Sequence, residues 1–428
     1  MQLFDTYLEW LEDTESPRLF HRWTLISGIG TLLGRNAVLL PDTQLETYAN
    51  QYIVLVGPPA CRKNASINVM KKLLKKSGID HFASDRTTKE KFILDLQTGF
   101  NLDSDNEALN LLDLGLDEGV EVQICAPELQ DFLGAGNLDF ISFLTHLWDM
   151  PEDYNYRIKA MKTNNKIRKP TVNLLGGATP TNISSIFPDQ VGGQGFLSRT
   201  LMIFGGGQRQ KIAWPTPPDA EIEEALVESF KIIRHACRGV CKINDKARQM
   251  LTEIYNSDIR LPDARLESYM GRRHTSLLKL CMITAAADLS FDNGISITEE
   301  HVEYANTMLS FTEGFMGRAL GDFGASSNSA DREAVLKLVE KGGEVGVKPK
   351  QVVESLSATF DSVHSILRVV EELRAAGKIY LTVSGNFVAM MEGPVKGVHC
   401  NFELLLEGKD YYEKLSQEKT TKENQSKV

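Results

Sequence analysis

The chain has 428 residues, of which 42% are hydrophobic and 24% are charged, and its formal net charge is −10 at pH 7. This length allows two or three domains, and the composition is typical of a globular protein. The negative charge excludes a surface coated with basic residues for nucleic acid, so such binding needs a local basic patch. Six scattered cysteines favour reduced thiols. There is no apolar signal segment and no run that could span a bilayer, so we expect a soluble cytoplasmic protein with no membrane partner.

Residues 1–50 hold two helical patterns, which we expect to form a helical collar on the core. The apolar run 52–56 then predicts a buried parallel strand, which breaks at a glycine and two prolines before a helix. P-loop proteins hold phosphate with a strand, a glycine-containing loop, a lysine and a helix that follow one another in this order. The candidate nucleotide contacts are Gly57, Pro58, Pro59, Ala60, Cys61, Arg62, Lys63, Asn64 and Ala65.

This loop departs from the usual pattern G-x-x-x-x-G-K-[ST]. Gly57 and Lys63 match it, but Arg62 replaces the second glycine and Asn64 replaces the hydroxyl that binds Mg²⁺. Asn64 can offer a carbonyl oxygen to the metal, and one hypothesis is that Arg62 itself supplies positive charge to the phosphate. A strand, turn and helix without a nucleotide is the alternative.

A second predicted strand covers residues 80–84, and the acid-rich stretch 99–118 predicts a solvated excursion. Residues 120–126 predict a third strand, which runs into Pro127 and Glu128. P-loop ATPases carry an acid for the Mg²⁺ shell at this strand end, often followed by a glutamate that polarises the attacking water. Glu128 occupies the second of these positions and Pro127 the first. The alternative for Glu128 is a helix-start glutamate that the helix dipole stabilises.

Residues 154–170 predict a β-hairpin with a turn near Lys162. In an acidic protein, one concentrated basic hairpin is a candidate contact for the phosphates of single-stranded DNA, and a solvated charged face is the alternative. The candidate DNA-binding residues are Arg157, Lys159, Lys162, Lys166, Arg168 and Lys169.

The next apolar strand, 171–176, leads to Thr179, whose polar side chain can sense a γ-phosphate or serve only in a turn. A glycine-rich loop then delivers Arg199 before the strand 200–204. An arginine in this position can contribute charge to the phosphates of a neighbouring subunit, and an ordinary surface arginine is the alternative.

Residues 214–218 form a proline-rich linker, and residues 219–320 are helical throughout, with Arg272 and Arg273 at the start of the third helix. After a flexible linker, residues 331–395 predict three helices and a two-stranded wing, the winged-helix form of helix-turn-helix. Its mixed charges leave DNA and protein open as partners. The tail 409–428 is charged, and we expect it to be frayed.

The phosphate loop, the segments Gly177-Ala-Thr-Pro180 and Phe196-Leu-Ser-Arg-Thr-Leu-Met-Ile-Phe204, and the helix from Arg272 to Leu280 occur in a characteristic order. In these segments the chain resembles AAA+ ATPases of the replicative helicase branch, above all MCM-type helicases and the replication ATPases of phages and plasmids. The resemblance covers about residues 20–395, and the Leu-Ser-Arg segment before a strand is its most specific part.

The resemblance implies an α/β fold with a parallel sheet: an AAA+ P-loop core over 51–214, a helical lid over 215–322 and a C-terminal winged helix. Lys63 would bind ATP, Glu128 would polarise water, and Thr179 would be a sensor. Arg199 would act on a neighbour's nucleotide, and Arg272 or Arg273 would be the lid sensor. The implied cofactors are ATP and Mg²⁺, the latter at Asn64. The implied assembly is a homo-oligomer, in the family a hexameric ring, with the basic hairpin lining its pore.

Three hypotheses follow from this resemblance. The first is an oligomeric, ATP-driven DNA motor (a helicase-like replication ATPase) of a phage or mobile element. The second is a nucleotide-gated helicase loader or replication initiator with slow or no hydrolysis, which uses the winged helix to contact replication proteins. The third is a binding scaffold with a vestigial nucleotide site, and the joint presence of Lys63, Glu128 and Arg199 is evidence against it.

Overall fold

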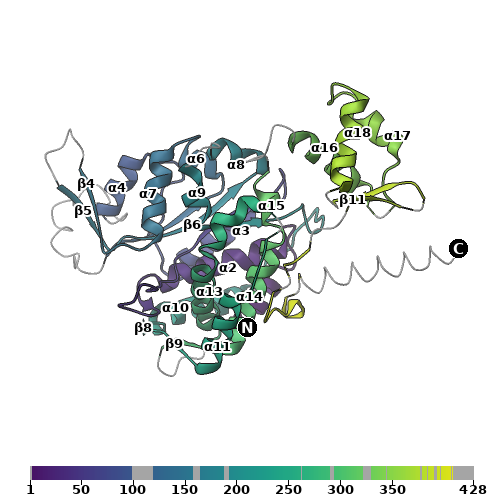
Figure 1. The fold of residues 1–428 in the computed structure, drawn as a ribbon. Helices are drawn as coiled ribbons and strands as arrows, with labels where there is room; N and C mark the ends of the chain where they lie inside the picture. The colour runs from purple at the N-terminus through teal and green to yellow at the C-terminus, as the bar shows by residue number, and fades with distance from the viewer. Residues whose placement is uncertain are drawn as a thin grey trace. The chain divides into compact units, whose positions relative to one another are not determined.

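The computed structural model describes residues 2–98, 119–157, 164–187, 192–261, 263–289, 294–321, 329–343, 345–375, 378–382, 384–389, 393–395, 397–405 and 407. The chain divides into two compact units (Figure 1). The first contains residues 1–320 and 394–407, and the second contains residues 321–393 and 408–428. The predicted excursion 99–118 and the tail 409–428 lie outside the described residues.

The first unit contains a parallel sheet of four strands, in the order β3–β6–β2–β7. Phe82 extends this order by one parallel bridge to Gln123 of β3, where the sequence predicted a longer strand. Nearly every strand residue is buried, so β2 and β7 are mostly apolar runs, whereas β3 and β6 also bury the polar residues Gln123 and Asn173. The four strands are β2 (Tyr52–Val56), β3 (Glu121–Ala126), β6 (Thr171–Ala178) and β7 (Thr200–Phe204).

Helices cover both faces of this sheet. On one face, α2 and α3 pack together and against β6, and on the other, α7 and α9 pack together. Successive residues of a strand face opposite sides of the sheet. In β6, Gly176 faces Leu129 of α6, whereas Gly177 faces Ile67 of α3 on the other side. The helices in these two layers are α2 (Arg18–Leu33), α3 (Lys63–Lys76), α6 (Leu129–Leu133), α7 (Leu138–Trp148) and α9 (Gly192–Leu197).

The segment 1–50, which the sequence presented as a collar, belongs to the first unit, and its second helix lies in the interior of that unit. Helix α2 is buried from Leu19 to Leu33 and contacts the sheet, α1, α3, α10 and α13. Even its polar residues, such as His21 and Arg22, are buried, so this helix is covered on all sides. The suggested boundaries at 50/51 and 214/215 therefore do not separate compact units.

The predicted hairpin is confirmed as an antiparallel pair, β4 (Asp153–Arg157) and β5 (Asn164–Arg168). Its base is fixed by aromatic contacts: the rings of Tyr154 and Phe143 of α7 lie 4.8 Å apart, and the Lys89 ammonium lies 5.1 Å from the Tyr156 ring. The remaining elements between the phosphate loop and β7 are α4 (Lys89–Thr98) and α8 (Pro180–Ile186).

The region 219–320 is mainly helical, as the sequence predicted, and it packs within the first unit. Residues 394–407 return to this unit and lie along α14, where the Asn306 amide donates to the carbonyl oxygen of Val398 and Thr307 Oγ1 accepts from the Asn401 amide. We call residues 394–407 the strap.

The remaining elements of the first unit are α1 (Gln2–Trp10), β1 (Ala37–Val38), α10 (Ala220–Ala236), β8 (Gly239–Val240), β9 (Lys242–Ile243), α11 (Asp245–Asn256), η1 (Ala264–Leu266), α12 (Glu267–Met270), α13 (Arg273–Ala287), β10 (Ser296–Ile297), α14 (Glu299–Glu313), α15 (Met316–Ala319) and η2 (Phe402–Leu404).

The second unit has its own core, built from three helices and a two-stranded antiparallel ribbon. Val347 bridges to Phe387 at the edge of this ribbon. The elements are α16 (Ser329–Lys341), α17 (Pro349–Leu356), α18 (Val363–Ala375), β11 (Ile379–Leu381) and β12 (Phe387–Ala389). Across the described ranges of both units, no helix combines the length and apolar character that a bilayer crossing needs.

Candidate nucleotide-binding site

Three neighbouring strands end at one edge of the sheet and bring the predicted phosphate contacts together. The amide of Gly57 donates to the carbonyl oxygen of Ala178, so the phosphate loop and Thr179 leave adjacent strands side by side. On the other side of β6, a Cβ atom on Gly177 would collide with the Pro127 carbonyl oxygen, so glycine there allows β3 to end close by. We call this the phosphate-loop edge, and polar residues at the carboxyl ends of parallel strands form a common ligand site.

Lys63 is the chemically informative residue of this edge. Its side chain is buried, with 6% of the residue exposed, at the start of α3. Its ammonium donates to the carbonyl oxygens of Gly57 (2.9 Å) and Pro58 (3.1 Å), and it lies 3.6 Å from Cys61 Sγ. Among the described residues no carboxylate pairs with it. A buried lysine without an acid partner fits an anionic ligand, because an uncompensated buried charge is costly.

The loop backbone adopts the conformation that glycine would provide. Arg62 has φ +63° and caps α3 from the left-handed region, and Ala60 has φ +66°. For a residue with a side chain this conformation costs about 1–2 kcal/mol. The Arg62 guanidinium pairs with Glu15, and its carbonyl oxygen accepts from Ser16 Oγ at 3.0 Å. Contacts from the segment between α1 and α2 therefore hold the strained position.

Glu128 and Thr179 complete the edge. Glu128 follows β3, is exposed, and occupies the N-cap position of α6 without a side-chain capping bond. Thr179 caps α8 by accepting from the Asn182 amide at 3.3 Å, and its hydroxyl lies 2.9 Å from that of Thr181. Both side chains stand at strand ends beside the loop.

The donors available for Mg²⁺ are few. Asn64 is exposed in the first turn of α3, and Pro127 occupies the position of a metal-shell acid. In the described parts of the chain, no three histidine, cysteine or acidic side chains gather as a metal site. Because Mg²⁺ usually retains several waters, one protein donor fits this ion beside phosphate, and the Asn64 carbonyl oxygen would be that donor.

Arg199 lies at the opposite edge of the sheet. It precedes Thr200, which pairs with Tyr52 at the start of β2, whereas Phe204 pairs with Val56 beside the phosphate loop. Five strand residues span about 17 Å, so Arg199 cannot reach the phosphate loop of its own chain. Its guanidinium instead pairs with Asp149 at 2.7 Å and donates to the Gly195 carbonyl oxygen at 3.0 Å.

The two adjacent lid arginines have different environments. Arg272 is partly exposed and contacts Asp149 at 3.4 Å, beside Arg199. Arg273 is buried at the start of α13, where it pairs with Glu313 at 2.8 Å and donates to Asn306 at 3.0 Å. This buried ion pair removes Arg273 from the candidate nucleotide contacts. We call Trp148, Asp149, Arg199, Arg272 and Lys279 the arginine cluster.

Lys279 is a buried part of this cluster. Its ammonium lies 3.9 Å from the Trp148 ring centroid and donates to the Asn50 carbonyl oxygen at 3.1 Å. Burial lowers the pKa of Lys279 from 10.5 to about 7, against the nearby Asp149 carboxylate, which raises it, while Arg199 and Arg272 lower it further. Its charge therefore changes near neutral pH.

This shift makes stability depend on pH. Between about pH 7 and 10 the unfolded chain binds a proton at Lys279 that the folded chain does not, so stability falls as pH falls. The contribution is about 1.4 kcal/mol per pH unit. Chemical unfolding at pH 7, 8 and 9 should show that the slope of stability against pH is smaller in Lys279→Met than in the unchanged chain. Lys246→Met, at an exposed position, should keep the slope; equal slopes in all three proteins would contradict the burial effect.

The basic hairpin is partly neutralised at its base. Strand β4 begins at Asp153, one residue before the predicted hairpin, and Asp153 pairs with Lys166 at 2.7 Å. Lys169 lies 3.9 Å from Glu152. The predicted hairpin 154–170 contains no acid, but the two residues that precede it, Glu152 and Asp153, bring acids to its base. Lys159, Lys162 and the Arg157 side chain lie outside the described residues.

Sequence reasoning missed Glu15, Trp148, Asp149 and Lys279. Asp149 is 50 residues from Arg199 and 123 from Arg272, so no local spacing connects them. Lys279 could have been identified from the sequence as a residue with a specific partner, because a buried lysine within an apolar helix needs one.

The sequence matches no family model and no curated protein. Among solved structures, the chain is similar to a full-length MCM homolog from Methanopyrus kandleri, at 15% sequence identity and a TM-score of 0.41. The match covers 74% of this chain and 60% of that chain.

Proposed function

We propose that the chain is an oligomeric ATPase of the AAA+ replicative helicase type, an ATP-driven DNA motor of a phage or mobile element. The observation that carries this proposal is the buried Lys63, without a carboxylate partner among the described residues, at a sheet edge shared with Glu128 and Thr179. Lys63 binds the β- and γ-phosphates, Glu128 orients the attacking water, and Thr179 contacts the γ-phosphate.

The strand order supports an AAA+ core. One strand, β6, separates the phosphate-loop strand β2 from β3, which ends two residues before Glu128. The end of β6 at Thr179 therefore lies between the proposed phosphate loop and the proposed catalytic acid, which supports the assignment of these three roles to one site. Mg²⁺, held with help from Asn64, supplies charge neutralisation to the phosphates.

The arginine cluster supports catalysis shared between two copies of the chain. Arg199 precedes a strand that extends about 17 Å toward the phosphate loop of its own chain, and Arg272 shares Asp149 with it, so we assign both to the nucleotide of a neighbour. A head-to-tail interface that presents one edge to the other repeats around a closed ring, in our proposal a hexamer. Arg272 is the lid sensor in this arrangement.

The hairpin is the proposed contact for single-stranded DNA. In the sequence, Lys159 and Lys162 lie between β4 and β5, whereas the described base cations Lys166 and Lys169 face acids. We therefore assign the phosphate contacts to Lys159 and Lys162, and the base of the hairpin contacts α4 and α7.

A loader or initiator is the second candidate, and the second unit supports it. If residues 331–395 are a winged helix, α18 is its recognition helix, and its cations face acids: Arg374 lies 2.7 Å from Glu371 and Arg368 lies 3.8 Å from Glu372. Val363 and Leu367 are about half exposed on the same helix. Such a surface fits a protein better than DNA. Replacing residues 322–393 by a flexible linker, which keeps the strap, should then abolish partner recruitment and leave assembly intact.

ATP hydrolysis by the purified chain, measured across protein concentrations with and without single-stranded DNA, tests the motor. The specific rate should rise with concentration, rise again with DNA, and lose the DNA effect in Lys159→Ala/Lys162→Ala. Lys63→Ala should weaken ATP binding by about 10- to 100-fold, because it removes charge-assisted hydrogen bonds. Lys72→Ala, exposed on the same helix, is the matched control. ATP binding without hydrolysis would favour the loader, and unchanged binding in Lys63→Ala would exclude the site.

A further inference from the structure

One carboxylate holds both arginines of the cluster. Asp149 Oδ2 accepts from Arg199 at 2.7 Å, and its Oδ1 lies 3.4 Å from nitrogens of both Arg199 and Arg272. The Arg199 side chain is 11% exposed, whereas those of Asp149 and Arg272 are 43% and 38% exposed. The carboxylate therefore lies at the surface, and the two guanidinium groups converge on it.

Trp148 forms a common platform for the cations. The guanidinium carbons of Arg199 and Arg272 lie 5.6 Å and 5.9 Å from its ring, and the Lys279 ammonium lies 3.9 Å from it. Two arginines outnumber the single carboxylate, and Lys279 adds a further positive charge when it is protonated. Attraction between a ring face and cations helps to keep these groups together despite their repulsion. The cluster therefore has an excess of positive charge that an anion with several oxygens can satisfy.

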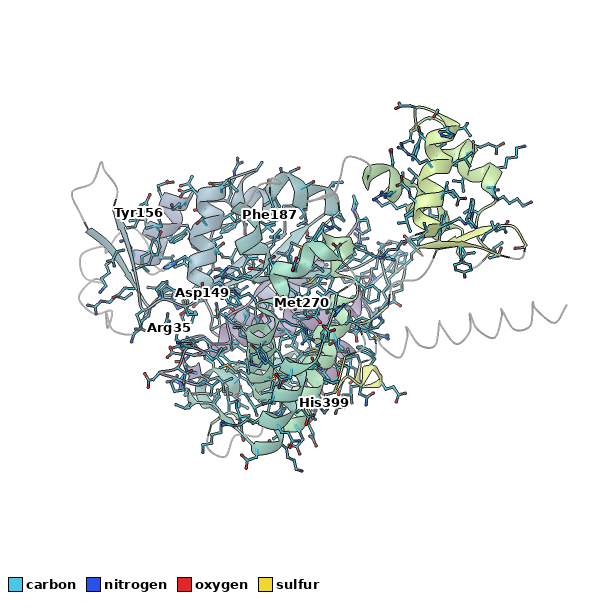
Figure 2. All side chains as sticks on the ribbon, viewed as in Figure 1. Arg35, Asp149, Tyr156, Phe187, Met270 and His399 are labelled. Carbon is cyan, nitrogen blue, oxygen red and sulfur yellow. The ribbon has the colours of Figure 1, made fainter. Side chains whose placement is uncertain are left out.

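Asp149 also lies at the root of the hairpin. It ends α7, and Met150 follows in a left-handed conformation with φ +55°. The Arg35 guanidinium donates to the carbonyl oxygens of Met150 and Pro151, each at 2.7 Å, and β4 begins two residues later. Figure 2 shows Asp149 and Arg35 on the side of the unit that carries the hairpin residue Tyr156.

We propose that Asp149 is an internal stand-in for phosphate: it holds Arg199 and Arg272 in the single chain and yields them to the phosphates of a neighbouring copy's nucleotide. The assignment of those phosphates to a neighbouring copy rests on the proposed function. Both guanidinium groups then exchange one anionic oxygen ligand for another, so they are already aligned before assembly. Only three residues join Asp149 to β4. A change in the contacts of Asp149 therefore also changes the position of the hairpin base.

Charge and geometry favour the exchange. A carboxylate offers two oxygens and one negative charge, whereas a polyphosphate offers more of both, and guanidinium groups bind either in a bidentate way. The partial exposure of Asp149 keeps its ion pairs weak enough to be replaced. Asp149 is thus a positioning residue that competes with the neighbour's nucleotide.

Binding of inorganic tripolyphosphate to the cluster tests this competition directly. The signal is the Trp148 fluorescence, obtained as the difference between matched chains with and without Trp148→Phe. All chains carry Lys63→Ala, so that the phosphate loop does not bind the probe. Asp149→Asn should bind tripolyphosphate about two- to fivefold more tightly, since an ion pair of this exposure no longer competes.

Matched variants separate this effect from a change in folding. Asp149→Glu keeps the competing charge and should bind as weakly as the parent chain. Glu152→Gln, an exposed acid in the same segment, should also leave binding unchanged, and Arg199→Ala should weaken it. Unfolding midpoints verify that each variant is folded. Unchanged or weaker binding in Asp149→Asn, or no response in any chain, would overturn the proposal.

This assay needs neither hydrolysis nor assembly, so its failure differs from failure of the proposed function. Tighter binding in Asp149→Asn together with a parent chain that neither binds ATP nor self-associates would support the stand-in and reject the ATPase. An active, assembling ATPase whose Asp149→Asn variant binds tripolyphosphate normally would reject the stand-in alone.

Discussion

Replacement of Arg199 by alanine is expected to lower ATP hydrolysis by about 1,000-fold while ATP binding is retained, the loss typical of an arginine that stabilises phosphoryl-transfer charge. The reason is its position at the sheet edge remote from the phosphate loop of its own chain. Hydrolysis is measured at a protein concentration that saturates assembly, and ATP binding is measured separately by a fluorescent nucleotide.

Mixing provides a sharp test of action between subunits. Arg199→Ala keeps an intact Lys63, and Lys63→Ala keeps an intact Arg199, so an equal mixture forms about a quarter of its head-to-tail interfaces with both residues. Hydrolysis should therefore return when two inactive proteins are combined. Arg248→Ala, at an exposed position of α11, should behave like the unchanged chain. If the mixture stays inactive although the chains co-assemble, Arg199 does not act on a neighbour.

The second large effect concerns stability of the first unit. Arg22 in α2 is almost fully buried, with 1% of its side chain exposed, and it pairs with Glu407 of the strap at 2.8 Å and 3.0 Å. Burial alone would lower the pKa of Arg22, but Glu407 and Tyr304 reverse this and raise it. Glu407→Ala leaves an unpaired buried charge and should lower the free energy of unfolding by about 3–5 kcal/mol.

Denaturant unfolding of the full chain, followed by circular dichroism, measures this loss. Glu403→Ala lies in the same strap at an exposed position and should leave the midpoint unchanged. The double variant Arg22→Met/Glu407→Met should recover most of the stability, because apolar side chains can replace a buried ion pair at little cost. A midpoint for Glu407→Ala equal to that of the Glu403→Ala control would show that the pair does not hold the strap.

The sequence by itself determined the elements whose signal is local. The three segments before Gly57, Pro127 and Thr179 were predicted as strands and form buried parallel strands; only the first is a continuous apolar run, which is typical of a strand covered on both faces. The hairpin and the three helices of the second unit were also predictable from turn residues and periodicity. The candidate loop, acid and threonine were identified in this way, as residues that follow strands.

Only the tertiary structure decided which residues meet. The strand order β3–β6–β2–β7 brings Glu128, Thr179 and Lys63 to one edge, and no sequence spacing specifies that order. Arg272 and Arg273 are adjacent in sequence, but a helix turns about 100° per residue, so at the start of α13 one faces Asp149 and the other faces the buried Glu313.

The same reason applies to the largest errors of sequence reasoning. Helix α2 was assigned to a collar because nothing local reveals that α10, α13 and the sheet all cover it. The strap was not recognised, since Glu407 is 385 residues from its partner Arg22. Local pattern determines each helix and strand, whereas burial and ion pairing between distant segments depend on the packing of the whole unit, and the arginine cluster is formed by that packing.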